Sequence, residues 1–168
     1  MTPVTVVGAG FAGCEAAWTL AQNGIPVTLW EMKPQKFSPA HHSPDFAELI
    51  CSNSFKASRL ESAAGLLKAE MERLGSLCVP CAKETAVAAG GALAVDRDRF
   101  SALVTEKIRS HPLITVREGE VTEIPDGNVI IATGPLTDPA LTQALADATA
   151  GSAAPAWTGE SFYPTDEG

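Results

Sequence analysis

The sequence predicts an α/β fold organised around a parallel sheet, and three apolar runs carry this prediction. The first run, residues 3–7, is rich in valine and leads straight into a segment with three spaced glycines, residues 8–13. The second run, residues 25–30, ends at the acid Glu31, and the third, residues 129–132, ends in a Thr-Gly pair. Strand, glycine turn, helix and strand in this order form a βαβ unit. We therefore expect a Rossmann-like fold of the FAD/NAD(P)-binding type, with the third run returning to the centre of the sheet.

The glycine spacing has a physical purpose. Gly8 permits a tight turn, Gly10 lets the backbone approach a diphosphate, and Gly13 lets the following helix lie close to the strand. The free N–H groups of the first helical turn and the helix dipole then face the anion. The alternative is a glycine-rich turn that holds no ligand. The candidate cofactor-binding residues of this segment are Gly8, Ala9, Gly10, Phe11, Ala12 and Gly13.

The acid after the second run stands where a dinucleotide-binding fold needs one. Glu31 lies 18 residues beyond Gly13, at the position whose carboxylate accepts hydrogen bonds from ribose hydroxyls. An acid there disfavours a phosphorylated ribose, so it favours FAD or NAD over NADP. The neighbouring Met32 is a further candidate cofactor-binding residue.

The third run adds a flavin signal. A parallel strand that ends at the switch point in Ala-Thr-Gly brings its backbone close to a bound dinucleotide. Large FAD-binding oxidoreductases commonly end a strand in this way, and this segment resembles theirs. The alternative is a buried strand with a tight exit turn. Together with the glycine segment, the pattern favours FAD over NAD and makes Thr133 and Gly134 candidate cofactor-binding residues.

The rest of the chain alternates between helical and strand-like patterns. Apolar residues recur at helical spacing between Leu60 and Leu74, and Asp96 precedes a second such stretch as an expected N-cap. We expect residues 1–148 to form one domain and 149–168 an irregular or disordered tail. In chain order, the other expected elements are a loop at 32–44, a short helical segment at 46–50, a helix at 60–74 stopped by Gly75, a helix from Asp96 through Ile108, a strand at 113–117 paired with 120–124 as a hairpin or meander, and a helix from Thr137 or Asp138 to about Ala148.

Composition excludes several classes of protein. The chain has 168 residues, 45% of them hydrophobic, and a formal net charge of −8. That charge argues against a generic nucleic-acid-binding surface, which needs clustered Lys and Arg. No run of 18 apolar residues and no basic N-terminal signal is present, so we expect a cytoplasmic protein without a membrane partner. The four cysteines are then expected to be free thiols.

Several motifs together resemble one family. The chain is similar to the folate- and FAD-dependent tRNA uracil-5-methyltransferases, relatives of the glucose-inhibited division protein A group, from residue 4 to about 145. The Cys-Ser-Asn-Ser and Gly-Gly-Ala-Leu-Ala-Val-Asp-Arg stretches are the most specific. The motifs that carry the resemblance are residues 7–17, Glu31-Met32-Lys33-Pro34, Pro39-Ala40-His41, residues 46–54, residues 65–71, residues 90–97 and residues 132–137.

The resemblance implies a reaction. The family transfers a one-carbon unit from methylenetetrahydrofolate to carbon 5 of a T-arm uridine in tRNA, with reduced FAD as the electron source and NAD(P)H as its reductant. Members are much longer than this chain, which therefore resembles an N-terminal portion that lacks a C-terminal segment. We do not expect this chain alone to be a competent enzyme. Two alternatives stay open: a generic FAD-dependent oxidoreductase, and a non-catalytic nucleotide-binding module.

Cys51 is the catalytic candidate. A thiol flanked by serine and asparagine in a loop can have its thiolate stabilised by nearby donors, although a buried cysteine acting as a small hydrophobe is commoner. The family resemblance implies a functional role for Cys51. His41 and His42 are candidates for a base beside it.

The remaining cysteine pair has a plainer interpretation. Cys78 and Cys81 form a Cys-x-x-Cys motif, which at a helix start can be a redox dithiol. Here the pair follows the 60–74 helix, so we expect two semi-buried thiols in a connecting strand or loop. With no second such motif, we expect no metal site.

Overall fold

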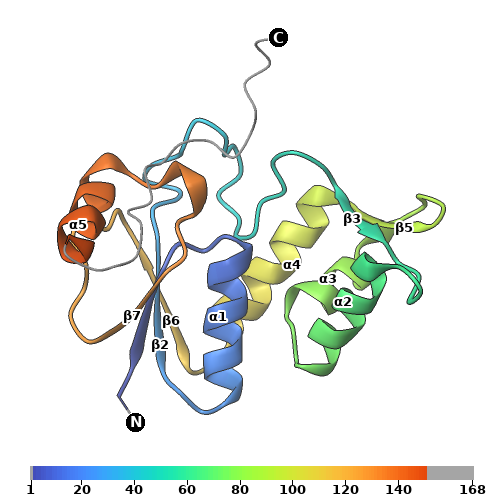
Figure 1. Ribbon diagram of the computed structural model, residues 1–168, viewed down its shortest axis with the longest axis horizontal. Helices are drawn as coiled ribbons and strands as arrows, with labels where there is room; N and C mark the ends of the chain where they lie inside the picture. The colour runs from blue at the N-terminus through green and yellow to red at the C-terminus, as the bar shows by residue number, and fades with distance from the viewer. Residues whose placement is uncertain (1, 151–168) are drawn as a thin grey trace.

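Four parallel strands form the central sheet of the structure, a computed structural model that describes residues 2–150. The sheet contains β1 (Val4–Val7), β2 (Val27–Glu31), β6 (Ile114–Glu118) and β7 (Asn128–Ile131) in the order β6-β2-β1-β7 (Figure 1). The chain leaves β1 toward β2 on one side and returns to pair with β1 on the other through β7. This reversal of strand order beside β1 is the switch point at which open α/β sheets bind ligands. The expected fold class is confirmed.

The outermost strand differs from expectation in one respect. β7 pairs with β1 and, within residues 2–150, lies at the edge of the sheet rather than at its centre. Ile130 on this strand is 37% exposed, whereas Val6 on the neighbouring β1 is fully buried. The expected return to the centre is therefore wrong for the described part of the chain.

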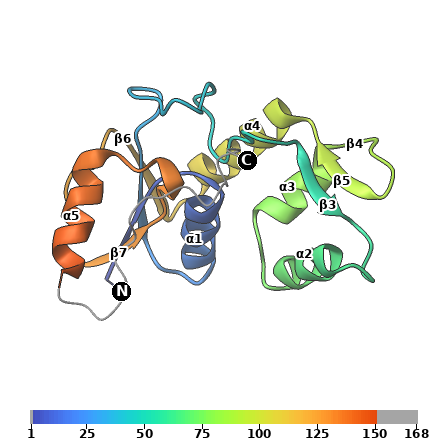
Figure 2. The same ribbon diagram turned by 45° about the horizontal axis from the view of Figure 1, so that its top comes forward.

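Helices cover both faces of this sheet. α1 (Phe11–Gln22) and α4 (Arg97–Ser110) lie on one side, and α5 (Pro139–Thr149) lies on the other (Figures 1 and 2). α1 presents small residues to the sheet, and both Ala17 and Cys14 are fully buried. Small side chains allow the close helix-to-strand approach that the glycine segment requires. The beginning of α1 is thereby fixed at the carboxyl ends of the strands.

A second, smaller sheet lies between β2 and β6 in the sequence. Its strands are β3 (Ser54–Ala57), β4 (Ala86–Val87) and β5 (Ala92–Val95), paired antiparallel in the order β3-β5-β4. Two helices, α2 (Ala63–Arg73) and α3 (Cys78–Glu84), accompany it in the part of the molecule away from the parallel sheet (Figure 2). The sequence pattern did not reveal this sheet, because strands of two to four residues are too short to show alternation.

Three phenylalanines join the two parts. The Phe11 ring stacks on Phe100 at 5.5 Å between centroids and lies 5.7 Å from Phe55. Phe55 and Phe100 meet edge to face at 5.3 Å, and Phe100 is fully buried. Aromatic pairs in these geometries add to the stabilisation from burial. The glycine segment that contains Phe11 is therefore anchored to both β3 and α4.

Most helix ends agree with the sequence. The Asp96 side chain accepts a hydrogen bond from Arg99 N at the start of α4, and Asp138 does the same for Ala140 N at the start of α5. α2 begins later than expected because Ser62 caps it, and Gly75, at φ +85°, follows its end. Residue 149 ends α5, and the expected tail from 151 onward lies outside the described residues.

Two expected elements are absent from the described region. Residues 120–124 form no strand, because β6 pairs in parallel with β2 and Gly119, at φ +148°, turns the chain away. Residues 46–50 form no helix, because Ala47 adopts φ +48° and donates its N–H to Ala9 O. Both segments lie over the carboxyl ends of the parallel strands, where the tertiary contacts determine their course.

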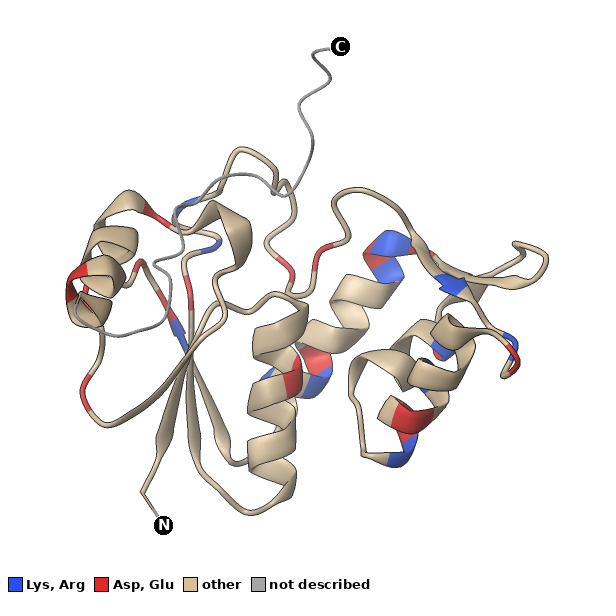
Figure 3. Ribbon diagram, in the orientation of Figure 1, with Lys and Arg blue, Asp and Glu red and all other residues tan. Residues whose placement is uncertain are grey.

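The charges are spread over the surface. Figure 3 shows Lys and Arg interspersed with Asp and Glu along α2 and α4. No helix among residues 2–150 is long and apolar enough to cross a membrane.

Candidate functional site

Two of the three spaced glycines are required by the fold itself. Gly8 has φ +98°, and a Cβ there would lie 2.6 Å from Ala132 O. A Cβ on Gly13 would lie 1.7 Å from Gly8 O, so any side chain would push α1 away from β1. These contacts explain why the strand, the turn and the helix can approach so closely.

Gly10 is different, because the protein leaves the space beside it empty. Its φ of −71° is open to any residue, and a Cβ there would meet no described atom within 4 Å. Neither backbone strain nor packing explains a glycine at this position. A ligand that approaches the backbone does explain it, and this is the role assigned to the second glycine of the motif.

The amide groups next to Gly10 lack intrahelical partners. The first hydrogen bond of α1 runs from Cys14 N to Gly10 O at 2.9 Å, so the N–H groups of Phe11, Ala12 and Gly13 precede the helical ladder. No side chain among residues 2–150 caps this end of the helix. Free amides and the positive end of a helix dipole are the features that attract an anion.

Glu31 ends β2 beside this helix start and is only 7% exposed. Its Oε2 accepts from Ala9 N at 2.8 Å and its Oε1 from Lys33 N at 3.0 Å. The Ala9 amide is therefore occupied, and Ala9 contributes a wall rather than a free donor. A carboxylate offers about four acceptor positions, and these two bonds leave Glu31 able to accept from a diol.

A cavity of about 320 Å³ lies at the carboxyl ends of the parallel strands. This volume is within the usual range for small-molecule and cofactor sites. Every cofactor-binding candidate from the sequence except Gly13 lines it, including Glu31, Met32, Thr133 and Gly134. The structure therefore brings together residues that lie more than a hundred positions apart in the chain.

The exit of β7 closes one side of this cavity. Ala132 N donates to Val7 O at 2.8 Å, which continues the ladder beyond the strand. Gly134, at φ +71°, then starts a short 3-10 turn, and the Thr133 and Thr137 hydroxyls share a hydrogen bond of 2.5 Å. The backbone of Thr133 thus lies beside Gly8, and both Thr133 and Gly134 line the cavity.

The side chain of Phe11 packs away from the glycine segment. Its ring belongs to the phenylalanine cluster with Phe55 and Phe100. The residue itself lines the cavity and carries one of the free amides. Phe11 is therefore placed to bind through its backbone while its ring holds the segment in position.

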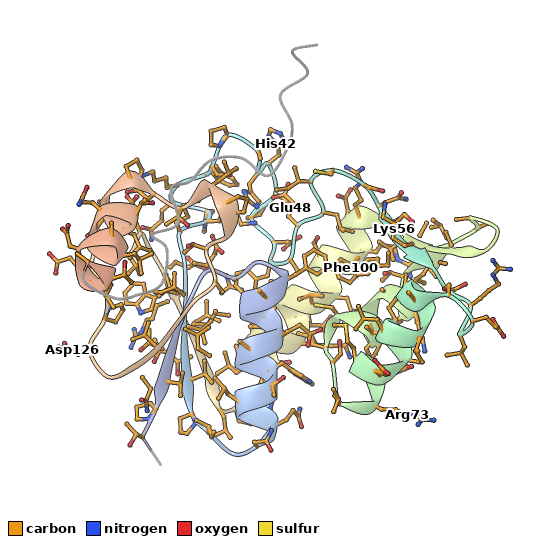
Figure 4. All side chains as sticks on the ribbon, viewed as in Figure 1. His42, Glu48, Lys56, Arg73, Phe100 and Asp126 are labelled. Atoms are coloured by element: carbon orange, nitrogen blue, oxygen red, sulfur yellow. The ribbon has the colours of Figure 1, made fainter. Side chains whose placement is uncertain are left out.

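A buried lysine organises the loop after β2. Lys33 is 4% exposed, and its Nζ donates to Ser43 O at 3.0 Å and to Asp45 O at 2.5 Å, with Glu48 Oε2 at 3.5 Å. Figure 4 shows Glu48 with His42 on this loop. Sequence reasoning missed Lys33 and Glu48, because neither spacing nor composition distinguishes a buried lysine from a solvated one.

Glu48 is held in its ionised form. Burial raises the pKa of this carboxyl, but the N–H groups of His42 and Ser43 and the Lys33 ammonium outweigh burial and leave the pKa below its ordinary value. The carboxylate therefore fixes the loop between Lys33 and Glu48 across one wall of the cavity.

Cys51 follows this wall and is exposed. It is not among the residues that line the cavity, although its neighbour Ile50 is. His41 is hydrogen-bonded to Ser38, and neither His41 nor His42 has a hydrogen bond to Cys51 in the described region. The structure therefore does not bring the two histidines to the thiol as bases.

The Cys-x-x-Cys pair departs from expectation. Cys78 and Cys81 lie in helix α3 and not in a strand or loop, and both are buried. The cause lies far away in sequence: the Glu15 carboxylate accepts from Leu77 N and Cys78 N and so caps the helix. Burial raises the pKa of both thiols, that of Cys81 to about 11, so neither is a ready thiolate. No cluster of metal-binding side chains occurs within residues 2–150.

Two carboxylates of the cavity lining, those of Glu120 and Asp138, share one cation. Lys36, from the loop after β2, forms ion pairs with Glu120 and with Asp138, the latter at 2.7 Å. The hydrogen bond from Lys36, together with that from Ala140 N, lowers the pKa of Asp138 to about 2. This contact joins three segments that are otherwise separate.

Replacing Lys36 with methionine is expected to change how stability depends on pH. A carboxyl with a lowered folded pKa stabilises above its unfolded pKa of about 3.9, and that stabilisation is lost as the pH falls toward about 2. The Lys36→Met chain should therefore be less stable than the unmodified chain at pH 7, and the difference should shrink between pH 4 and 2. Urea unfolding across that range measures it.

Lys68→Met is the matched control, since the Lys68 Nζ donates only to the carbonyls of Phe55 and Ala64. Its effect on stability should stay constant over the same pH range. A Lys36→Met effect that also stays constant would contradict the assigned ion pair.

Comparison with known proteins connects this geometry to a family. The family model described as glucose inhibited division protein A matches residues 3–157. A methylenetetrahydrofolate–tRNA-(uracil-5-)-methyltransferase TrmFO of Enterococcus faecalis is 58% identical over 142 residues, and one of Geotalea uraniireducens is 61% identical over 143. Each alignment covers 84% of this chain and 33% of the relative. The chain thus spans about a third of the length of these curated relatives.

Solved structures support the fold. The GidA structure of Aquifex aeolicus superposes with a TM-score of 0.59 at 17% identity, covering 75% of this chain and 21% of that one. The p-nitrophenol 4-monooxygenase PnpA of Pseudomonas putida gives a TM-score of 0.50 at 18% identity, with coverage of 76% and 34%. At such identities the likeness concerns the fold alone.

Proposed function

This chain belongs to the glucose inhibited division protein A family, and from that premise we propose that it forms the FAD-binding N-terminal part of a tRNA uracil-5-methyltransferase. Relatives that are about 60% identical bear the name of the methylenetetrahydrofolate-dependent enzyme. The observation that carries the proposal is the empty space beside Gly10, next to unpaired helix amides and a buried acid. Together these three features match what the diphosphate and the ribose of a dinucleotide need.

The residues around the cavity suit the parts of FAD in turn. The amides of Phe11, Ala12 and Gly13 would hold the diphosphate, with Gly10 allowing the approach. Glu31 would accept from the adenosine ribose. The backbone at Thr133 and Gly134, beside Met32 on the facing wall, would border the rest of the cofactor.

Once reduced by NAD(P)H, the proposed reductant, the bound flavin would supply the two electrons that convert a transferred methylene group into a methyl group. The exposed Cys51 would act as the thiol that adds to the uracil or carries the one-carbon unit. The folate, most of the tRNA surface and the remainder of the cofactor site would be bound by the further two-thirds of a complete enzyme. Such an enzyme would work in the cytoplasm, where tRNA is modified.

Replacing Glu31 with glutamine is expected to weaken FAD binding about 10- to 100-fold. A hydrogen bond to a charged acceptor is worth roughly 1.5–3 kcal/mol; the single amide oxygen of glutamine can still accept from Ala9 N, while the charge and the acceptor for Lys33 N are lost. Fluorescence titration with FAD measures the dissociation constant. Glu70→Gln, on the surface of α2, is the control and should leave it unchanged. Equal affinity for the Glu31 variant would refute the ribose assignment.

Methyl transfer tests the whole proposal. In the Enterococcus faecalis relative, the aligned N-terminal third is replaced with this chain, and transfer from labelled methylenetetrahydrofolate to a T-arm transcript is assayed. The chimera should be active, and Cys51→Ala within it should reduce the rate at least 100-fold, whereas Cys81→Ala should retain activity. An active Cys51→Ala chimera would disprove the role of this thiol, and an inactive but folded and flavin-bound chimera would count against the function.

A further inference from the structure

We propose that His41 is a neutral hydrogen-bond donor of the cavity, and that it binds an oxygen acceptor of the flavin dinucleotide through Nε2–H. The inference rests on the proposed function, since it concerns the same cavity. His41 lines that cavity together with Glu31, Lys33 and Glu48.

The Ser38 hydroxyl sets the tautomer of the imidazole. Ser38 is 8% exposed, and its Oγ lies 2.5 Å from His41 Nδ1. The same Oγ accepts from Ala40 N at 3.3 Å. A hydroxyl oxygen can accept twice, but the described residues offer the Ser38 hydroxyl proton no acceptor other than Nδ1, so that proton goes to Nδ1. His41 Nδ1 is then an acceptor, and the ring proton resides on Nε2.

Burial, helped by nearby positive charge, favours the neutral form of His41 at pH 7. Burial is the main cause that lowers its pKa, and the Lys33 ammonium and His42 act in the same direction. Glu48 and Glu31 act the other way, but both carboxylates are already engaged by backbone N–H groups. A lower pKa agrees with the acceptor role of Nδ1, because a histidinium would present a second N–H to the Ser38 hydroxyl.

The remaining ring nitrogen has no hydrogen-bond partner among residues 2–150. His41 N donates to Ser38 O at 3.2 Å and Nδ1 is engaged, which leaves only Nε2–H. No fully buried side-chain nitrogen or oxygen in the described part of the chain lacks a hydrogen bond. His41 Nε2 is therefore not fully buried, and the residue itself lines the cavity. An acceptor there must come from solvent or a ligand, and the diphosphate and the ring carbonyls of a flavin dinucleotide both supply oxygen acceptors.

Two substitutions of His41 separate a donor at Nε2 from one at Nδ1. The amide nitrogen of glutamine reaches the place of Nε2, and that of asparagine reaches only the place of Nδ1. In FAD titrations of the full chain, His41→Asn should weaken binding about five- to tenfold, the effect of one lost hydrogen bond. His41→Gln should stay within about threefold of the unmodified chain. Equal binding by His41→Asn and the unmodified chain would overturn the inference.

ADP, used as a second probe, identifies which oxygen is bound. If His41→Asn weakens ADP and FAD binding equally, the acceptor is on the diphosphate; if only FAD binding weakens, the acceptor is on the flavin ring. Nitrogen-15 NMR of the histidines provides a readout that a merely structural role would not move. It should show the Nε2–H tautomer for His41 at pH 7.5, with a shift toward a mixture in Ser38→Ala.

The Nδ1–H tautomer or a histidinium at pH 7.5 would also overturn the inference. An unmodified chain that binds neither FAD nor ADP would instead refute the proposed function, and this inference would fall with it. The two failures are therefore distinguishable.

Discussion

Replacing Gly13 with alanine is expected to prevent stable folding. A Cβ at this position would lie 1.7 Å from Gly8 O, a backbone atom that cannot rotate away. Relief requires α1 to move off β1, which also separates buried groups such as Val6 and Ala17. Such a displacement should cost about 4 kcal/mol or more, a large part of the roughly 5–15 kcal/mol by which domains are stable. Soluble expression and the urea midpoint measure the loss.

Gly91→Ala is the matched control for this substitution. A Cβ on Gly91 would meet no described atom within 4 Å, and its φ lies outside the left-handed region. Its stability should therefore stay close to that of the unmodified chain. If Gly13→Ala were as stable as Gly91→Ala, the close contact between α1 and β1 would be wrong.

Replacing Gly10 with alanine is expected to weaken FAD binding and to leave the fold intact, unlike the replacement of Gly13. The added methyl group enters space that no described protein atom occupies, so the only structural cost is a poorer N-cap, about 1 kcal/mol or less. The same methyl group stands between the helix amides and a diphosphate. We expect FAD affinity to fall on the order of 100-fold, or about 2.7 kcal/mol, while the circular dichroism spectrum is unchanged.

Thermal unfolding and FAD titration of the same preparation test this pair of expectations. Gly10→Ala that binds FAD as tightly as the unmodified chain would show that the diphosphate does not approach here. Loss of folding in Gly10→Ala would show that the position has a structural role, which the empty space excludes.

The sequence predicted the first βαβ unit well because its signals are local. Glycines at fixed spacing, a valine-rich strand and the acid Glu31 each act within a few residues of their own position. The caps of α4 and α5 were also predictable, because Asp96 and Asp138 bond to amides two or three residues away. Elements that depend on such local interactions can be predicted from the sequence without knowledge of the tertiary contacts.

Elements that depend on distant partners were not predictable. Helix α3 begins at Cys78 because Glu15 caps it across 63 positions, and no pattern around Cys78 announces that contact. The chain at Ala47 takes a left-handed turn because its N–H bonds to Ala9 O. The choice of β2 as the partner of β6, instead of the next segment, is likewise a tertiary outcome.

The features of the candidate site likewise fall into those that the sequence predicts and those that only the structure reveals. Glycine spacing, Glu31 and the Thr133-Gly134 exit came from the sequence and meet at one cavity. Three other features could be found only in the structure. They are the hydrogen bond from Ala9 N to Glu31, the burial of Lys33 and the Ser38–His41 pair. Each arises from side chains whose types are common and whose roles depend on burial.

The most direct test of the account is an amide-by-amide NMR titration of the chain with FAD. The prediction is that the N–H signals of Phe11, Ala12 and Gly13 shift most and saturate together, while that of Ala9, already bonded to Glu31, shifts less. In Gly10→Ala these shifts should disappear. Saturable FAD binding that leaves these three amides unmoved, or no FAD binding by the folded chain, would contradict the claim that the start of α1 holds the diphosphate.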